Sequence, residues 1–552
     1  MRIIKKIHIL VATLLMGVMS CTYDLVLEDN PVTDGSESYI SLSINTGITT
    51  RVGSSPPPAS LDDAITSARM VLYGADDHIV KYAFNFNIRN NASNTGFTQN
   101  GIHPEYGDYL YNGNLGGNRF ITFARPVKYA DYEMLIIINP FRYISEIPMD
   151  YLKAPASVMT RSGEDNLDIV NVTNVGQPLS RLLESVYQPN PYFGSGYMPV
   201  TEGGIVMTNF KGLVHVPKSS LGNTPDEANK NPIPVTVERT VAKVQVENLN
   251  AGSYSLETTD PLAQAINISW QLNTTNKWFY WMRQFAPVIN PDGSQGSMET
   301  STDLDRMQLY AIDPNFSGLT DANGGNSGMR TFNFQYAINQ ALNSDYGASN
   351  ITFNNGLGGG EYALENTMDV DEQDESVMTT VLIQLSYIPN NSFYGYNNYF
   401  VYNNIVITPN EMIGYATTPT SIPPALTGLA TAIYNIMHDP DEPIDLSNNY
   451  LVSWGLNSGF ETADGLKFFH QCKNYYSVKI RHSVSGDPDQ PLYARYGVVR
   501  NNCYIVKLGE VSGFGSPTVV NPAAMSAEIS VQPWGKYSQG ANIGEDGEVI
   551  GK

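Results

Sequence analysis

Short runs in which apolar and polar residues alternate recur along the chain and predict β-strands. The alternation is clearest at 39–45 and 235–246. Clusters of Asn, Gly, Pro and Ser separate the runs, as the turns of an antiparallel sheet require. Further strands are expected at 68–73, 79–86, 120–124, 134–138, 380–388, 399–407, 476–481, 503–508 and 527–531.

Helical patterns are expected at 335–342 and 425–437, and Ser180 could cap a short helix that carries Leu182, Leu183 and Val186. Many short strands with few helices predict a mainly β protein, in which two β-sandwich domains follow one another in tandem. The run 230–234 carries two prolines that punctuate the chain. We therefore expect an N-terminal domain at 39–234 and a C-terminal domain at 235–552.

The first residues have the pattern of a secretory leader. Positive charges at Arg2, Lys5 and Lys6 precede the apolar run 7–18, which is too short for a helix to cross a bilayer. Residues 1–20 are thus predicted to be a lipoprotein signal peptide, ending in Val-Met-Ser before Cys21. Lipid on Cys21 would anchor the protein to a membrane, with the acidic stretch 21–38 as its tether. Ordinary cleavage, with Cys21 incidental, is the alternative.

Composition narrows the class of partner. The formal net charge is −22, so nucleic acid is not expected as a ligand, because phosphate binding needs clustered Lys and Arg.

Besides Cys21 the chain has Cys472 and Cys503, each followed by an alternating run. If these two strands are neighbours, a disulfide is possible; two separate thiols are the alternative.

No motif for catalysis, a metal or a cofactor is found. The seven histidines are scattered, without a zinc-binding helix. The acidic run 369–375 has Asp374 where a calcium loop needs Gly, and Thr380 where it needs Glu. We expect no enzymatic activity. The aromatic run 393–402 fits either a face that stacks on sugars or ordinary packing across a sheet.

Four runs carry a resemblance to a known family. They are Val-Thr-Val-Glu-Arg-Thr-Val-Ala-Lys-Val at 235–244, Tyr-Tyr-Ser-Val-Lys-Ile-Arg-His at 475–482, Tyr-Gly-Val-Val-Arg-Asn-Asn-Cys-Tyr at 496–504 and Ile-Ser-Val-Gln-Pro-Trp at 529–534. Together they resemble the Mfa-type fimbrillins, which are pilus subunits of anaerobic Gram-negative bacteria. The resemblance implies transthyretin-like sandwich domains and a lipoprotein precursor, acylated with palmitate, at the cell outer membrane.

The resemblance also implies a route of assembly into a surface fimbrium. An arginine-specific surface protease would cut between Arg51 and Val52 and remove the first strand, 39–45. Ile40, Leu42 and Ile44 share one face of that strand, and burying them is worth roughly 4–9 kcal/mol. A donor strand from 525–552 of another subunit would then fill the groove, giving fibres for adhesion and biofilm formation.

Two alternatives stay open at the level of sequence. The tail after Trp534 is glycine-rich and acidic, which makes a poor strand. The chain is thus expected to be a stalk subunit or else a tip, anchor or accessory subunit. The second alternative belongs to a different functional class: a monomeric surface lipoprotein that binds a glycan or another receptor and keeps its first strand.

Overall fold

The computed structural model describes the chain in segments. These are residues 35–45, 67–88, 109–111, 119–122, 124–140, 169–183, 186–187, 200–201, 204–210, 212–250, 253–284, 311–316, 334–335, 353, 356–368, 373, 377–389, 398–482, 495–520, 522–525 and 527–533. The predicted class, mainly β with sandwich packing and few short helices, is confirmed.

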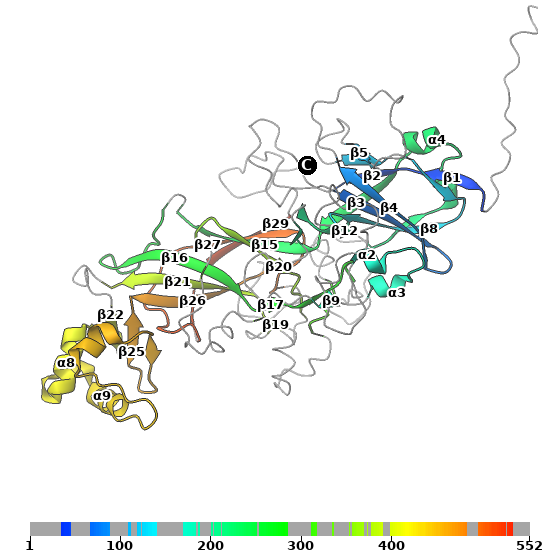
Figure 1. Cartoon of the computed structure of the whole chain (residues 1–552). Coiled ribbons are helices and arrows are strands. Elements are labelled where there is room, and N and C mark those ends of the chain that lie inside the picture. Colours follow the sequence, from blue (N-terminus) through cyan, green and yellow to red (C-terminus); the bar gives the residue numbers. More distant parts are fainter. Residues whose placement is uncertain are drawn as a thin grey trace, which may run out of the picture.

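A nine-stranded sheet builds the N-terminal part, with strand order β12-β14-β2-β6-β5-β4-β3-β8-β13 (Figure 1). The sheet curls, so that β12 also pairs with β8 through Met207 and Ile138. Its strands are β2 (Leu42–Asn45), β3 (Ser67–Gly74), β4 (Val80–Ile88), β5 (Tyr109–Tyr111), β6 (Arg119–Thr122), β8 (Tyr132–Ile138), β12 (Met207–Asn209), β13 (Val214–Val216) and β14 (Ile233–Arg239).

The two faces of this sheet bury different residues because side chains alternate along each strand. On the inner face, Met70 of β3 and Ile136 of β8 lie in one core with β2. On the outer face, Val71 and Leu135 pack under short helices. Elements that flank the sheet are β1 (Glu37–Ile40), β7 (Arg125–Lys128), α2 (Ile169–Val172), α3 (Leu179–Leu182), β9 (Val186–Tyr187), β10 (Val200–Thr201), β11 (Gly204–Ile205), η2 (Lys218–Ser220) and α4 (Pro225–Lys230).

The C-terminal part is a sandwich of two four-stranded sheets, β20-β15-β27-β29 and β16-β21-β26-β28. A buried hydrophobic core that includes Val244, Trp270, Ile383 and Val506 fills the space between them. The strands are β15 (Val241–Asn248), β16 (Gln264–Asn273), β20 (Gly360–Leu364), β21 (Thr380–Ile388), β26 (Lys473–Lys479), β27 (Asn502–Leu508), β28 (Ala523–Ala524) and β29 (Ala527–Pro533), with β17 (Thr275–Asn276), β18 (Trp278–Phe279) and β19 (Phe334–Gln335) beside them.

Residues 398–470 form a separate unit between β21 and β26, with a four-stranded sheet of order β23-β22-β25-β24. Helices cover one face of this sheet, at the end of the molecule away from β1 (Figure 1). Its elements are β22 (Asn398–Tyr402), β23 (Ile405–Ile407), α8 (Pro409–Thr417), η5 (Pro419–Ser421), η6 (Pro424–Leu426), α9 (Leu429–Met437), the π-helix η7 (Leu451–Gly455), β24 (Phe460–Glu461) and β25 (Lys467–His470).

Most predicted strands are confirmed, and three of them differ from the expected bounds. The strand expected at 399–407 is a hairpin, because Asn403 and Asn404 both take positive φ angles of 51° and 61°. The alternating run 235–246 is divided at Thr240, with β14 in the N-terminal sheet and β15 in the sandwich. Of the strand expected at 120–124, residues 120–122 lie in β6, and Ala124 lies before the start of β7. Except for Gln335, which lies in β19, the helix expected at 335–342 falls outside the described residues.

Candidate functional site

The first strand lies inside the N-terminal sheet and has a partner along each edge. β2 pairs with β6 in antiparallel register and with β14 in parallel register. Just before it, β1 pairs with β7. The segment 37–45 therefore runs in a groove whose walls are 119–128 on one side and 233–236 on the other.

Hydrogen bonds join this segment to both walls. Tyr39 exchanges two backbone hydrogen bonds with Gly222, at 2.8 and 2.9 Å. The Ile233 amide donates to the carbonyl of Ser41 at 2.8 Å, and the Leu42 amide donates to the hydroxyl of Thr122 at 2.8 Å. Without the segment, the polar groups of the groove walls would lose these partners, and another strand could satisfy them.

The side chains of the segment are buried on both of its faces. Ile40, Leu42 and Ile44 are at most 1% exposed and belong to the inner core of the sheet. Between them, Ser41 and Ser43 are also buried, and the Ser41 hydroxyl donates to the Thr122 carbonyl at 2.8 Å. An occupant of this groove must therefore alternate aliphatic and small residues.

The other residues predicted for maturation fall elsewhere. Cys21, Arg51 and Val52 lie outside the described residues, so lipidation and cleavage remain predictions. Within the predicted donor segment, β29 pairs along its length with β27 of the same chain, and Ile529 lies in the sandwich core. Only 534–552, also outside the described residues, is left as a donor.

The two cysteines do not meet the condition for a disulfide. Cys503 lies on β27 and Cys472 at the turn before β26, and these strands belong to different sheets. Both side chains are thiols. Burial raises the pKa of Cys472 to about 11, which keeps it protonated and unreactive at neutral pH.

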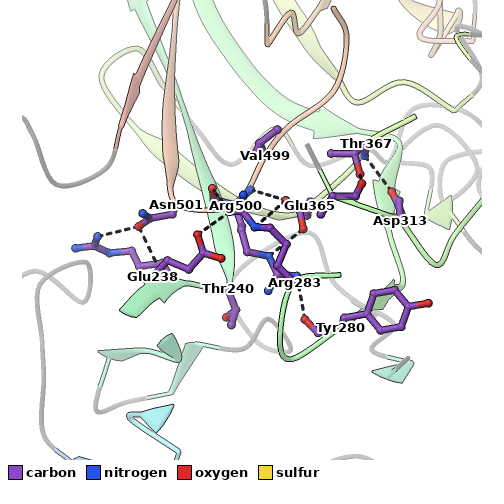
Figure 2. Close-up of polar contacts among 12 residues, drawn as sticks. Glu238, Thr240, Tyr280, Arg283, Asp313, Glu365, Thr367, Val499, Arg500 and Asn501 are labelled. Carbon is purple, nitrogen blue, oxygen red and sulfur yellow. Dashed lines mark hydrogen bonds and ion pairs between the residues drawn. The ribbon is translucent and has the colours of Figure 1, made fainter. Parts of the chain in front are cut away.

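A buried ionic network occupies the junction between the N-terminal sheet and the sandwich (Figure 2). Arg283 contacts Glu238 at 2.7 Å, and Arg500 contacts Glu365 at 2.9 Å. Arg500 also donates to the carbonyl of Tyr280 at 2.9 Å. All four charged side chains are at most 6% exposed. Two carboxylates thus balance two guanidinium groups, as buried charges require.

This network explains two of the sequence runs that carried the family resemblance. Glu238 comes from the run 235–244, and Arg500 with Asn501 comes from the run 496–504. The backbone amide of Asn501 donates to the carbonyl of Val241 at 2.8 Å, and its side chain accepts from the Arg239 amide at 3.3 Å. The sequence alone does not assign these runs a role, since the contacts join positions 45 to 262 residues apart.

The carboxylate of Asp313 is buried next to this junction. Its carboxylate accepts hydrogen bonds from Asn276, Asn315 and Thr367, but burial dominates and raises its pKa to about 7. An unfolded Asp ionises near pH 4. The unfolded state therefore binds fewer protons between about pH 4 and 7, so this group's stabilising contribution is present below pH 4 and is lost as the pH rises to 7.

We predict that the urea concentration at the unfolding midpoint of the unaltered chain decreases as the pH is raised from 4.5 to 7.5, partly because of Asp313. Asp313→Ala should be less stable at both values, since it removes the hydrogen-bond acceptor, but its midpoint should change less with pH. Circular dichroism at a series of urea concentrations measures both. An equal pH dependence in the two proteins would show that Asp313 does not titrate in this range.

The described half of the aromatic run 393–402, which fitted either a sugar-stacking face or packing across a sheet, lies inside the protein. Tyr399, Phe400, Val401 and Tyr402 are all buried, while 393–397 lie outside the described residues. Tyr399 stacks on Phe469 with ring centroids 4.8 Å apart, and its hydroxyl accepts from Asn474 at 2.9 Å. The described half of the run is thus core, which agrees with the alternative of packing across a sheet.

Two kinds of feature are absent from the described residues. They contain no group of three or more His, Cys, Asp or Glu side chains placed to hold a metal ion. No helix among them has both the length and the apolar character needed to cross a membrane.

Comparison with known proteins gives one family match. Residues 467–540 match the model described as major fimbrial subunit protein type IV, fimbrillin, C-terminal. No curated protein matches the chain significantly. The matched segment contains three of the quoted runs, at 475–482, 496–504 and 529–534, and the resemblance stated from them is confirmed.

Similar solved structures share low sequence identity with the chain. A candidate cell adhesion protein from Parabacteroides distasonis is 10% identical, with 91% of this chain and 100% of that one covered and a TM-score of 0.40. The tip fimbrial protein Mfa3 from Porphyromonas gingivalis is 11% identical, with coverages of 90% and 100% and a TM-score of 0.34. A fimbrilin from Porphyromonas gingivalis is 12% identical, with coverages of 91% and 98% and a TM-score of 0.34.

Proposed function

We propose that this chain, a fimbrillin-type adhesion subunit whose C-terminal segment 467–540 is that of the fimbrillins, is a structural subunit of a surface fimbrium. It is exported as a precursor with lipid on Cys21 and held at the outer membrane. An arginine-specific protease then cuts after Arg51, and the first strand leaves. A strand from another subunit takes its place, and the chain itself catalyses no reaction.

The position of β2 carries the proposal. The strand is buried between β6 and β14 and contributes three side chains to the core, yet Arg51 follows it by only a few residues. A cut there leaves the strand held by non-covalent contacts alone. Loss of the strand would expose two rows of backbone groups and an apolar groove, which is the template that strand addition needs.

One observation favours a terminal subunit as a second candidate. The native occupant of the groove has aliphatic residues at 40, 42 and 44, whereas 534–552 contains no three aliphatic residues at this spacing. A subunit that accepts a strand but offers a poor one suits the tip of a fibre. Purified mature protein that stays monomeric alone, and joins a fibre when other subunits are added, would support this candidate.

The proposal is tested by the start of the mature protein and by Arg51→Ala. Fibres sheared from cells should contain this chain beginning at Val52. Arg51→Ala should remain a cell-bound precursor and give no SDS-resistant ladder, because the strand stays tethered. Val52→Ala keeps the arginine and should still be processed and assembled. A sheared protein that begins at Cys21 would contradict the proposal.

A further inference from the structure

The unit 398–470 is inserted where the sandwich needs only a short turn. β21 and β26 are adjacent antiparallel strands, with Ser386 opposite Lys473 and a hydrogen bond of 2.9 Å from the Tyr387 amide to the Cys472 carbonyl. Such strands can be joined by a hairpin loop of a few residues. Closing the sandwich therefore does not explain the insertion.

The inserted unit has its own core and a firm attachment to the sandwich. Phe400, Leu429, Ile433 and Phe468 lie in a core made only of residues from this unit. At its base, Phe514 of the sandwich packs against Tyr399 and Phe469 of the unit. The helices that face outward are thus held in a fixed orientation, at the end of the molecule away from the first-strand groove (Figure 1).

The outward helices expose aromatic side chains that their core does not need. Tyr434 of α9 is 61% exposed, Tyr450 is 74% exposed and Trp454 of η7 is 68% exposed. Tyr450 and Trp454 lie on the same side of the π-helix, since its hydrogen bonds join residues five apart, as from the Leu456 amide to the Leu451 carbonyl at 3.1 Å. Tyr434 is held by stacking on His438 at 4.1 Å.

The same unit has an unbalanced charge. It contains seven carboxylates and a single lysine, and all seven carboxylates are exposed. Lys467 pairs with Glu461 at 3.1 Å, so it neutralises one of them. The carboxylates are Glu411, Asp439, Asp441, Glu442, Asp445, Glu461 and Asp464.

We propose that the exposed face formed by the segment 434–454, which carries these three aromatic side chains and four of the seven carboxylates, binds a Lys- and Arg-rich polypeptide segment of a partner protein. Aromatic faces attract ammonium and guanidinium groups through the ring quadrupole, and exposed carboxylates attract the same groups by charge-assisted hydrogen bonds. The aromatic rings and the carboxylates of this face therefore both favour a cationic ligand. A neutral glycan would use the rings and not the charge, and an acidic glycan would be repelled. The inference is independent of strand exchange.

The test uses the complete chain without its leader and a fluorescein-labelled nona-arginine peptide, followed by fluorescence anisotropy at 20, 150 and 500 mM NaCl. We expect binding that weakens with salt. Trp454→Ala should lower the affinity about 2–5-fold, and Tyr450→Ala combined with Trp454→Ala about tenfold. Tyr254→Ala is the matched control, because Tyr254 is 91% exposed and lies outside the unit.

Charge and chemistry are tested separately. Asp441→Asn with Glu442→Gln should weaken peptide binding without changing the thermal midpoint. Equal affinities for Trp454→Ala and Tyr254→Ala would overturn the proposal, since binding would then reflect only the net charge of the whole protein. Binding of maltoheptaose or mannopentaose that is insensitive to salt and lost in Trp454→Ala, without binding of nona-arginine, would overturn it in favour of a glycan site.

Discussion

Cutting the folded chain within 46–66 should make its first strand exchangeable while leaving the rest of the protein folded. The cut is made at a specific protease site placed at 47–52, on protein that has already folded. A labelled peptide copying residues 35–46 should then enter the cut protein and not the uncut one. Native gel fluorescence over hours to days measures the exchange.

The physical reason is the loss of the tether. In the uncut chain, 46–66 keeps the strand at a high effective concentration next to its groove, so that any peptide competes poorly. After the cut the strand is held by the contacts of Ile40, Leu42 and Ile44, worth about 4–9 kcal/mol before the cost of ordering the strand, and by its edge hydrogen bonds. The cut strand is therefore bound tightly but reversibly in its groove.

A matched peptide with Leu42→Asp gives the control. Leu42 is fully buried, so the substitution loses its apolar contacts and would bury an unpaired carboxylate. The altered peptide should bind at least about 100-fold more weakly than the native copy, a difference of roughly 3 kcal/mol. Equal uptake of the two peptides, or no uptake of either by the cut protein, would contradict a groove that selects its strand by side-chain packing.

Local pattern was sufficient to predict the first strand but not its surroundings. The alternation of Ile40, Leu42 and Ile44 indicated one buried face, and these three side chains are buried. The burial of Ser41 and Ser43 on the other face was not predicted, because serine is usually exposed. The walls of the groove come from 119–128 and 233–236, and local periodicity contains no information about pairing at such separations.

The inserted unit was missed although its sequence holds a readable signal. Thr408 and Glu411 form a capping box at the start of α8, with Pro409 in the first turn. This pattern marks a helix at 409–417, between the strand expected at 399–407 and the helix expected at 425–437, where no element was predicted. Only the adjacency of β21 and β26 reveals that the stretch is an insertion, and adjacency is a property of the folded sheet.

Arg500→Met should strongly destabilise the sandwich. Removal of the guanidinium leaves Glu365 without its partner at 2.9 Å and leaves the Tyr280 carbonyl without its donor. Glu238 and Glu365 would then share the single charge of Arg283. Breaking one member of a buried pair costs about 3–5 kcal/mol, because the remaining charge stays desolvated. Guanidinium unfolding monitored by tryptophan fluorescence measures the loss.

Two further variants separate the broken pair from the loss of a charge in general. Lys81→Met removes a lysine that contacts Asp77 at 2.5 Å on the surface, with both side chains more than 40% exposed, and should cost about 0–1 kcal/mol. Arg500→Met combined with Glu365→Met should recover part of the stability, since the uncompensated carboxylate is gone. If Arg500→Met were no more costly than Lys81→Met, the network would not hold the junction, and the run 496–504 would need another explanation.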